Sequence, residues 1–552
     1  MPGAATQRSY AGLTWIGPLL ILASHLASAQ RAPSPANRSA TPNAGDWPSY
    51  NRAVAGDRFS PLAGITPSNV AGLARVCTYT LPEVTSLQTG PVVIAGVMYF
   101  TTDTISYAID AATCLERWKQ VRHSETPGEL AVNRGFAYSN GRLFRGTSDA
   151  HVLAMDTADG HTRWDQAIGA KGPGVSIPMA PIADNGLVFV GNAGGDNAGV
   201  TGHVYALDAG DGHVVWQFDV VPANGAARAT WTDSALPITG GAFWTSFTFD
   251  ASRGILYVPA GNPAPDFDIG RRTGANLYTN SVIALDGATG RLLAYNQLVK
   301  DDAHDWDVDS PPTLLTTSSG RAVVASANKD GQLAVLDRSK VSRDTSRTGD
   351  PAAALPVLYR RPTTTRTNVD VPLSRDHVVR FCPGITGGSE WNGAAYSPAT
   401  NTIFVGAVDW CSRVQLEPEN APVPPTGKTW FAASNQDTMF DPPDSAKGWL
   451  TAFDADNGAV RWKYAATSPM LAGVTPTAGG LVFAADMHGT LFALDAANGR
   501  VLWHDDTGQS TGGGIVTYRV GGRQLVAVAS GMKSLVWPGG AQESHILVYG
   551  VR

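Results

Sequence analysis

The chain has 552 residues, of which 43% are hydrophobic and only 16% are charged, with 60 Gly and 36 Pro. This balance favours a turn-rich all-β protein over a helical one. The formal net charge of -6 lacks the basic excess of nucleic-acid-binding proteins, so we expect no nucleic-acid partner.

The N-terminus has the pattern of an export signal. Arg8 supplies positive charge before a short, interrupted apolar stretch, and the small residues at 27–29 form an A-x-A cleavage site. We expect residues 1–29 to be a cleaved signal peptide; an uncleaved membrane anchor is the alternative. Residues 30–45 are rich in Ala, Pro, Ser and Asn and predict a disordered leader. The mature chain, a domain over 46–552, has no apolar run of about 18 residues, so we expect a periplasmic or secreted protein without a transmembrane segment.

A repeat of the form Ala-x-Asp-x-x-x-Gly-x-x-x-Trp organises the rest of the chain. It occurs at 108–118 (with Cys114 in place of Gly), 154–164, 206–216, 452–462 and 493–503, with a variant at 284–295 and a half copy at 335–337. The closest copies are roughly 40 to 50 residues apart, as in four-stranded propeller blades. The sequence therefore predicts an eight-bladed β-propeller with tryptophan-docking repeats.

The repeat also has a local structural interpretation. Asp bonds its own backbone and Gly accepts a positive φ, so the two shape a tight turn after an apolar strand. The Trp lies on the returning strand, where its ring can wedge between blades with its N–H bonded. Residues 390–407 are predicted to supply two strands of a blade without the motif. The stretches 340–378 and 413–448 are predicted to be long surface loops over one face.

Four cysteines, with no C-x-x-C-H haem motif, favour two disulfides in an exported protein. Cys114 replaces the turn Gly of the first repeat, and Cys77 begins a strand upstream, so we expect these two to pair. Four buried thiols are the alternative.

Several motifs resemble those of the pyrroloquinoline quinone (PQQ)-dependent alcohol and methanol dehydrogenases. Residues 46–51 with 58–62 look like the family's first strand. The other matching motifs are 261–265, 276–281, 304–307 and 478–486. The chain is similar to this family over roughly residues 47–552, as a divergent member. The resemblance implies a disulfide between Cys382 and Cys411, and PQQ in the central funnel beside a metal ion.

The resemblance also assigns residues to the cofactor. Trp244 matches the Trp that stacks on PQQ, Arg134 matches an arginine that reaches its carboxylates, and Lys329 matches a residue that bonds the quinone oxygens. Further matching positions are Thr147, Gly194, Gly195 and Trp537. Outside the family context these would be a core Trp, a surface Arg and a turn Lys.

The metal ligands implied by the resemblance are Asp196, Asn262, Asp307 and Asp309. Carboxylate and amide oxygens suit a hard cation, Ca²⁺ or a lanthanide. Asp307 is also the expected general base, which takes the alcohol proton. Asp309 lies two residues on, which places it on the same face of an extended strand, and such an extra carboxylate resembles the lanthanide-dependent branch. A solvated acidic loop is the alternative.

The match has departures. The family's vicinal cysteine pair is replaced by Gly128-Glu129, a metal-binding Glu by Asp196, a Glu near PQQ by Gln88, and an aromatic or Asn residue by Leu471. We therefore weigh three functions. The first is a PQQ dehydrogenase acting on an alcohol that the sequence does not identify, with a separate cytochrome c as electron acceptor. The others are a cofactor-free binding or assembly scaffold, and a secreted hydrolase or lyase using Asp307 or His304.

Overall fold

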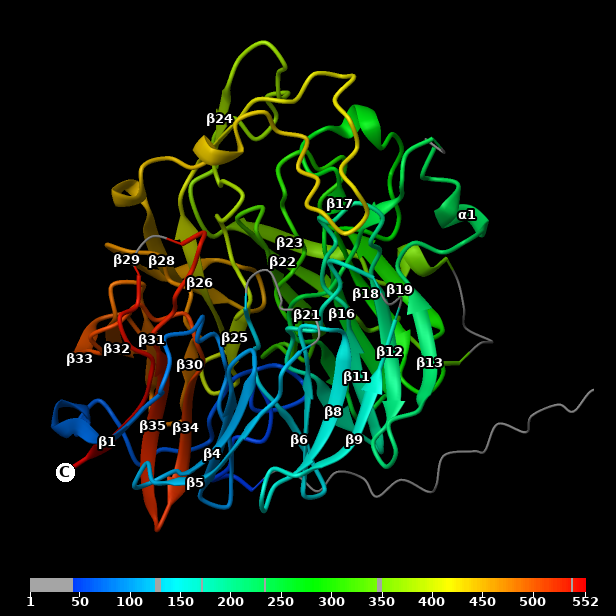
Figure 1. Ribbon diagram of the computed structural model, residues 1–552. Coiled ribbons are helices and arrows are strands. Elements are labelled where there is room, and N and C mark those ends of the chain that lie inside the picture. The colour runs from blue at the N-terminus through cyan, green and yellow to red at the C-terminus, as the bar shows by residue number, and fades with distance from the viewer. Residues whose placement is uncertain (1–42, 125–130, 170–171, 233–234, 345–349, 538–539) are drawn as a thin grey trace, which may run out of the picture. The chain divides into compact units, whose positions relative to one another are not determined.

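The computed structural model describes residues 43–124, 131–169, 172–232, 235–344, 350–537 and 540–552 (Figure 1). The predicted signal peptide, almost all of the predicted leader and the Gly128-Glu129 position lie outside these ranges. Within the described residues, no helix is long and apolar enough to cross a membrane.

Eight four-stranded antiparallel sheets form the blades of a β-propeller in the described part of the chain, as the repeat predicts. The first blade contains β2 Val92–Ile94, β3 Val97–Thr101, β4 Ile105–Asp110 and β5 Glu116–Val121, and the second contains β6 Ala137–Ser139, β7 Arg142–Gly146, β8 His151–Asp156 and β9 Thr162–Ala167. The third blade contains β10 Ile182–Asp184, β11 Leu187–Gly191, β12 His203–Asp208 and β13 Val214–Asp219, and the fourth contains β15 Thr248–Asp250, β16 Ile255–Ala260, β18 Ser281–Asp286 and β19 Leu292–Gln297. The fifth blade contains β20 Thr313–Thr316, β21 Ala322–Ala327, β22 Gln332–Asp337 and β23 Val357–Pro362. The sixth contains β25 Ala394–Ser397, β26 Thr402–Asp409, β28 Lys447–Asp454 and β29 Val460–Ala466, and the seventh contains β30 Thr475–Pro476, β31 Leu481–Ala485, β32 Thr490–Asp495 and β33 Val501–Asp506.

The eighth blade joins the two ends of the described chain. It contains β34 Ile515–Val520, β35 Arg523–Ser530, β36 His545–Val551 and β1 Leu73–Thr80. β1 pairs antiparallel with β36, so that Leu73 lies opposite Val551. The expected first strand at 46–51 with 58–62 is wrong: Trp47 and Ser60 make only isolated bridges, to Val93 and Thr477, although the Trp47 ring is fully buried. The chain turns between these two bridges, as the bond from the Arg52 N–H to the Ser49 carbonyl shows.

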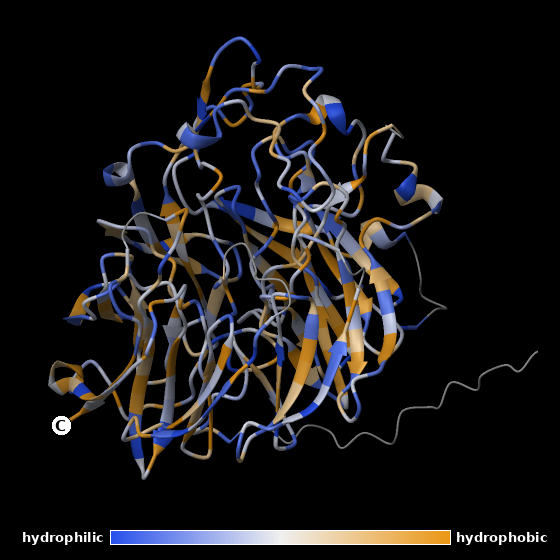
Figure 2. Ribbon diagram, in the orientation of Figure 1, coloured by the Kyte–Doolittle hydropathy of each residue, from blue (hydrophilic) through white to orange (hydrophobic). Residues whose placement is uncertain are grey.

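Hydrophobic residues are frequent along the strands of the blades (Figure 2). The largest buried cluster joins three consecutive blades through residues such as Phe144, Phe189 and Leu256. Each blade is therefore stabilised by its neighbours, because its apolar faces are buried against theirs.

The repeat tryptophans dock between blades as predicted. The indole N–H of Trp164 donates to the Ala209 carbonyl of the next blade at 3.2 Å, and Trp216 donates to Gly287 at 3.0 Å. The turn glycine of the next blade lies under the ring: a Cβ at Gly212 would meet Trp164 Cε3 at 2.7 Å. The Gly of the motif therefore serves both the turn and the docking of the preceding Trp.

We expect Gly212→Ala to destabilise the fold more than Gly186→Ala. Both glycines have φ near +80° in the same blade, but a Cβ at Gly186 meets nothing within 4 Å. Gly186→Ala should cost about 1–2 kcal/mol of backbone strain. Gly212→Ala should add about 1–3 kcal/mol because it displaces Trp164. Urea unfolding of both variants measures the difference, and equal unfolding midpoints would contradict the docking role.

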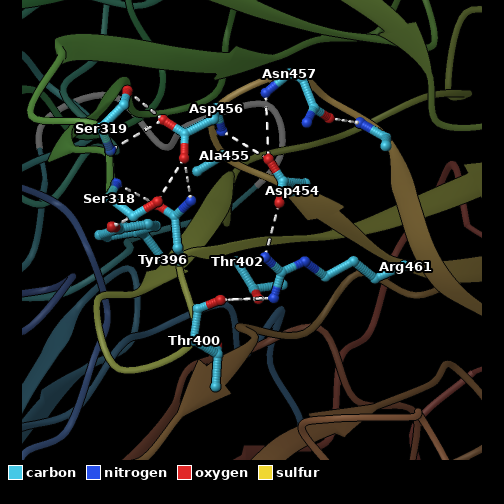
Figure 3. Close-up of polar contacts among 12 residues, drawn as sticks. Ser318, Ser319, Tyr396, Thr400, Thr402, Asp454, Ala455, Asp456, Asn457 and Arg461 are labelled. Atoms are coloured by element: carbon cyan, nitrogen blue, oxygen red, sulfur yellow. Dashed lines mark hydrogen bonds and ion pairs between the residues drawn. The ribbon is translucent and has the colours of Figure 1, made fainter.

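Polar contacts tie the turns of neighbouring blades together (Figure 3). Asp456, in the turn of the 452–462 repeat, accepts hydrogen bonds from the Ser318 and Ser319 hydroxyls at 2.5 Å each and from Asn401 Nδ2 at 2.8 Å. Ser318 and Ser319 belong to the turn between β20 and β21 of the preceding blade. The hydrogen bonds from Ser318 and Ser319 hold the pKa of Asp456 well below its usual value.

The remaining elements are short and lie in the connections. They are β14 Thr239–Gly240 paired with β17 Pro263–Ala264, β24 Val379–Phe381 paired with β27 Ser412–Val414, α1 Gly225–Arg228, and the 3-10 turns Val70–Gly72, Ile269–Arg271, Pro351–Ala353, Gln436–Thr438 and Pro443–Ser445. Figure 1 shows α1, β17 and β24 at one end of the blades. The prediction of an unbroken loop over 340–378 is wrong, because β23 completes its blade there against β22.

Both expected disulfides are present: Cys77–Cys114 and Cys382–Cys411. The first ties β1 to the turn after β4. The second joins the ends of the β24 and β27 pair and so holds the adjacent Trp410 in place. Cys114 adopts a φ of 59°, the left-handed conformation that the motif otherwise assigns to Gly.

Candidate functional site

The predicted site residues lie in connections that leave the blades at one face. Successive strands of a blade run antiparallel, so connections between its second and third strands emerge at the same face as connections between blades. Every predicted cofactor or metal residue falls in one of these two kinds of connection: Arg134, Trp244, Asp307 and Asp309 between blades, and Thr147, Gly194, Gly195, Asp196, Asn262, Lys329 and Trp537 within them. The short Asp-x-x-x-Gly turns emerge at the opposite face.

Asp307 is a buried carboxylate fixed through both of its oxygens. Oδ1 accepts the backbone N–H of Asn262 at 2.9 Å, and Oδ2 lies 3.1 Å from Lys329 Nζ. Gly261 lets the two loops approach, since a Cβ there would lie 2.6 Å from Asp307 Oδ1. Asp307 thus presents a rigidly held carboxyl group at 5% exposure.

Lys329 bridges two aspartates. Its ammonium group lies 3.1 Å from Asp307 Oδ2 and 3.1 Å from Asp305 Oδ1. Burial lowers the pKa of Lys329, but the two carboxylates outweigh burial and raise it well above its usual value. Lys329 is therefore a fixed cation and hydrogen-bond donor at this point.

Arg134 lies over the ring of Trp244. Its guanidinium carbon is 5.0 Å from the centre of the Trp244 ring and 5.3 Å from that of Trp391, and it donates to the Trp244 carbonyl and to Gln88. Burial lowers the pKa of Arg134 to about 10. Its Nε has no hydrogen-bond partner among the described residues. The arrangement combines an aromatic face with a buried cation that has a donor to spare.

An aromatic cluster surrounds this pair. Trp244 packs against a group that contains Trp391, Trp410, Trp537 and Leu471. Trp391 and Trp537 meet edge to face with ring centres 6.1 Å apart. The aromatic surface is therefore broader than the single Trp that the sequence singles out.

Three carboxylates from three loops meet near Asn262. Asp196, Asp266 and Asp305 each offer one oxygen, and these oxygens lie within 4.8 Å of one another. Asp266 also accepts a hydrogen bond from Asn262 Nδ2 at 3.1 Å. Burial, together with Asp196 and Asp305, raises the pKa of Asp266 well above its usual value. The sequence assigned Asp196 to the metal but missed its two neighbours.

Asp309 lies apart from this trio, beside Glu390. Neither carboxylate oxygen of Asp309 finds a hydrogen-bond partner within the described residues, and burial together with Glu390 raises its pKa well above the usual value. Burial also raises the pKa of Glu390 to about 7, although Lys329 opposes this. Residues 307–309 lie outside the named strands, ahead of β20. Glu390 and Leu471 line a small, partly open pocket, with room for about one water molecule.

The other predicted positions have structural contacts. Thr147 bonds Asp149 and the backbone of His151. Gly194, with a φ of 106°, approaches Gly174 too closely for any side chain, and Gly195 packs against Ala242. His304 stacks on Trp306 with ring centres 4.1 Å apart, which is a packing role.

These residues fit both PQQ and a metal ion. A planar anionic quinone needs an aromatic face and cationic donors, which Trp244, Arg134 and Lys329 supply. A hard cation needs several oxygen ligands and uncompensated negative charge. Asp266 Oδ2 has no hydrogen-bond partner in the described part of the chain, although Asp266 is fully buried, so the acidic trio meets this need.

The fold and site define an eight-bladed propeller whose loop face gathers the buried carboxyl group of Asp307, an aromatic face and an acidic cluster. Residues 47–342 match the family model of the glucose/ethanol/alcohol dehydrogenase β-propeller domain, which is the PQQ family. Residues 406–537 match the model of the outer membrane protein assembly factor BamB.

Individual proteins agree with the first match. A quinohemoprotein alcohol dehydrogenase of Comamonas testosteroni is 30% identical, over 90% of this chain and 73% of the relative. Its homologue ADH IIB of Pseudomonas putida is 29% identical, over 97% of this chain and 81% of the relative. The crystal structure of the Comamonas enzyme superposes with a TM-score of 0.80 at 26% identity, covering 92% of this chain and 80% of that one. The chain belongs to the PQQ-dependent alcohol dehydrogenase family, whose members are oxidoreductases acting on CH–OH donors.

Sequence reasoning missed Asp266, Asp305 and Glu390. Each stands inside or next to a motif already noted: Asp266 follows 261–265, Asp305 lies within 304–307, and Glu390 opens the strand pair at 390–407. These three residues could have been proposed from the sequence because each is acidic, stands inside or beside a noted motif, and lies in a connection on the same face as the other site residues.

Proposed function

We propose that this protein is an exported, metal-assisted PQQ dehydrogenase that oxidises an alcohol to an aldehyde or ketone. The observation that carries the proposal is Asp307, a buried carboxylate held by the Asn262 N–H and Lys329. It lies in a chain of the PQQ alcohol dehydrogenase family that also places Arg134 over Trp244.

The chain's own residues divide the work. PQQ, when bound, supplies the two-electron acceptor that takes hydride from the alcohol carbon, and a bound cation supplies Lewis acidity. Asp307 accepts the hydroxyl proton of the alcohol at its carboxylate. Lys329 holds that carboxylate in place, and Trp244 and Arg134 bind and orient the cofactor. Asp196 and Asn262 supply oxygen ligands to the cation.

Sequence features support the proposed compartment, and the family suggests the proposed electron acceptor. The signal-like residues 1–29 support export to the periplasm, where we propose that a separate cytochrome c takes the electrons. No C-x-x-C-H motif occurs in the chain, so a covalently attached haem of this kind is not available within it.

Reconstitution tests the proposal. The purified protein, loaded with PQQ and either Ca²⁺ or La³⁺, should acquire the quinone absorption band and reduce an artificial dye when an alcohol is added. Protein without PQQ is the control. If the protein neither acquires the quinone band nor reduces the dye with a panel of primary and secondary alcohols and either metal, the chain is instead a cofactor-free scaffold.

A further inference from the structure

The acidic trio is built from loops that only the fold brings together. Asp196 follows β11, Asp266 follows β17, and Asp305 precedes β20. Their oxygens lie within 4.8 Å of one another, and Asp266 and Asp305 are buried. Three ionised carboxylates at this separation repel each other strongly, and a cation between them relieves that repulsion.

The buried cationic side chains near the trio do not pair with all of its carboxylate oxygens. Lys329 reaches Asp305 Oδ1, but it is shared with Asp307. Arg272, the nearby buried arginine, donates to the backbone carbonyls of Pro265 and Asp266. Asp266 Oδ2 remains without a hydrogen-bond partner among the described residues. A buried carboxylate oxygen without a donor needs an explanation, and at Asp266, which has two further carboxylates within 4.8 Å, a bound cation supplies one.

We propose that the metal ion binds among Asp196, Asp266 and Asp305, with Asp266 as a direct ligand. This deepens the proposed function, on which it rests for the metal's presence. Three carboxylates carry the charge that a hard di- or trivalent cation balances, and oxygen is the ligand atom it prefers. Asp196 stands where the family has a metal-binding Glu, and its side chain is one methylene shorter. Asp266 adds a carboxylate that is not among the ligands implied by the family resemblance. Asp309 is then a neighbour of the site and not a ligand.

Terbium luminescence measures this binding without PQQ or substrate. The Trp430 backbone N–H donates to the Asp196 carbonyl at 2.7 Å, so Trp430 is the tryptophan we expect to sensitise bound Tb³⁺. Titration of the metal-free protein with Tb³⁺, followed by competition with Ca²⁺, gives both affinities.

Asp266→Asn should weaken Tb³⁺ binding at least about tenfold, since losing even an outer partner of a metal ligand costs 10- to 100-fold. Asp309→Asn is the matched control: it removes one equally buried charge outside the trio and should change the affinity much less. Asp266→Glu keeps the charge and should retain binding if Asp266→Asn proves unstable by circular dichroism.

Wild-type affinity in Asp266→Asn, or an equal loss in Asp309→Asn, overturns the assignment. So does a wild-type protein that binds no Tb³⁺. These results are distinct from failure of the proposed function, which is read from dye reduction with PQQ. If the wild-type enzyme is active but Asp266→Asn does not change the Tb³⁺ affinity, the metal binds elsewhere in the protein.

Discussion

Asp307→Asn should lower kcat for alcohol oxidation by roughly 10²-fold or more, because the variant keeps the shape of the side chain and removes the base. Asn retains one oxygen to accept the Asn262 N–H, so the loop should keep its position. PQQ binding should survive, because Trp244 and Arg134 are untouched. Dye-linked turnover at saturating alcohol, together with a PQQ titration, measures both effects.

The control for Asp307→Asn is Asp309→Asn, the carboxylate two residues along. It tests whether any buried charge in this connection is needed for turnover. A kcat that falls equally in the two variants would assign the loss to the electrostatics of the whole segment. A kcat unchanged in Asp307→Asn would remove Asp307 from the reaction.

Trp244→Ala should weaken PQQ binding far more than it destabilises the fold. Stacking of a heteroaromatic ring on an indole is worth on the order of 1–3 kcal/mol, which corresponds to roughly 5- to 150-fold in Kd. Trp244 is only partly buried, so the loss of core packing is limited. A PQQ titration by quenching of tryptophan fluorescence measures Kd.

Trp164→Ala is the matched control for Trp244→Ala. Trp164 is also a partly buried indole, but it docks between two blades through its bond to Ala209. It should lower the free energy of unfolding while leaving the Kd for PQQ unchanged. If Trp244→Ala leaves the Kd at its wild-type value, Trp244 is a packing residue.

The architecture could be predicted because it is periodic. The Ala-x-Asp-x-x-x-Gly-x-x-x-Trp motif marks the same turn in several blades, and each blade repeats the same local physics. The strands at 394–397 and 402–409 were also recognisable without the motif. β23 was not, because it lies in a Thr- and Pro-rich stretch whose strand pairing depends on β22.

The site could be predicted only where a motif carried it. Trp244, Asn262 and Asp307 stand in recognisable segments, and the structure brings Asn262 and Asp307 into contact. The approach of Asp266 to Asp196 depends on how two separate blades are placed, which no local pattern specifies. The same is true of Glu390, whose loop meets the Asp309 loop through the Ser310 hydroxyl.

The blade that combines β1 with β36 has a consequence for how the protein folds. Its outer strand precedes the seven other blades in the chain and its other three strands follow them, so the ring cannot close until all of these segments are available. Until then β1 has no partner, and the open ring exposes strand edges that can pair with other chains. Loss of a few C-terminal residues would therefore affect both ends of the chain at once. Conversely, new termini placed in an exposed turn elsewhere, with the natural ends linked, would leave every blade with its full set of strands.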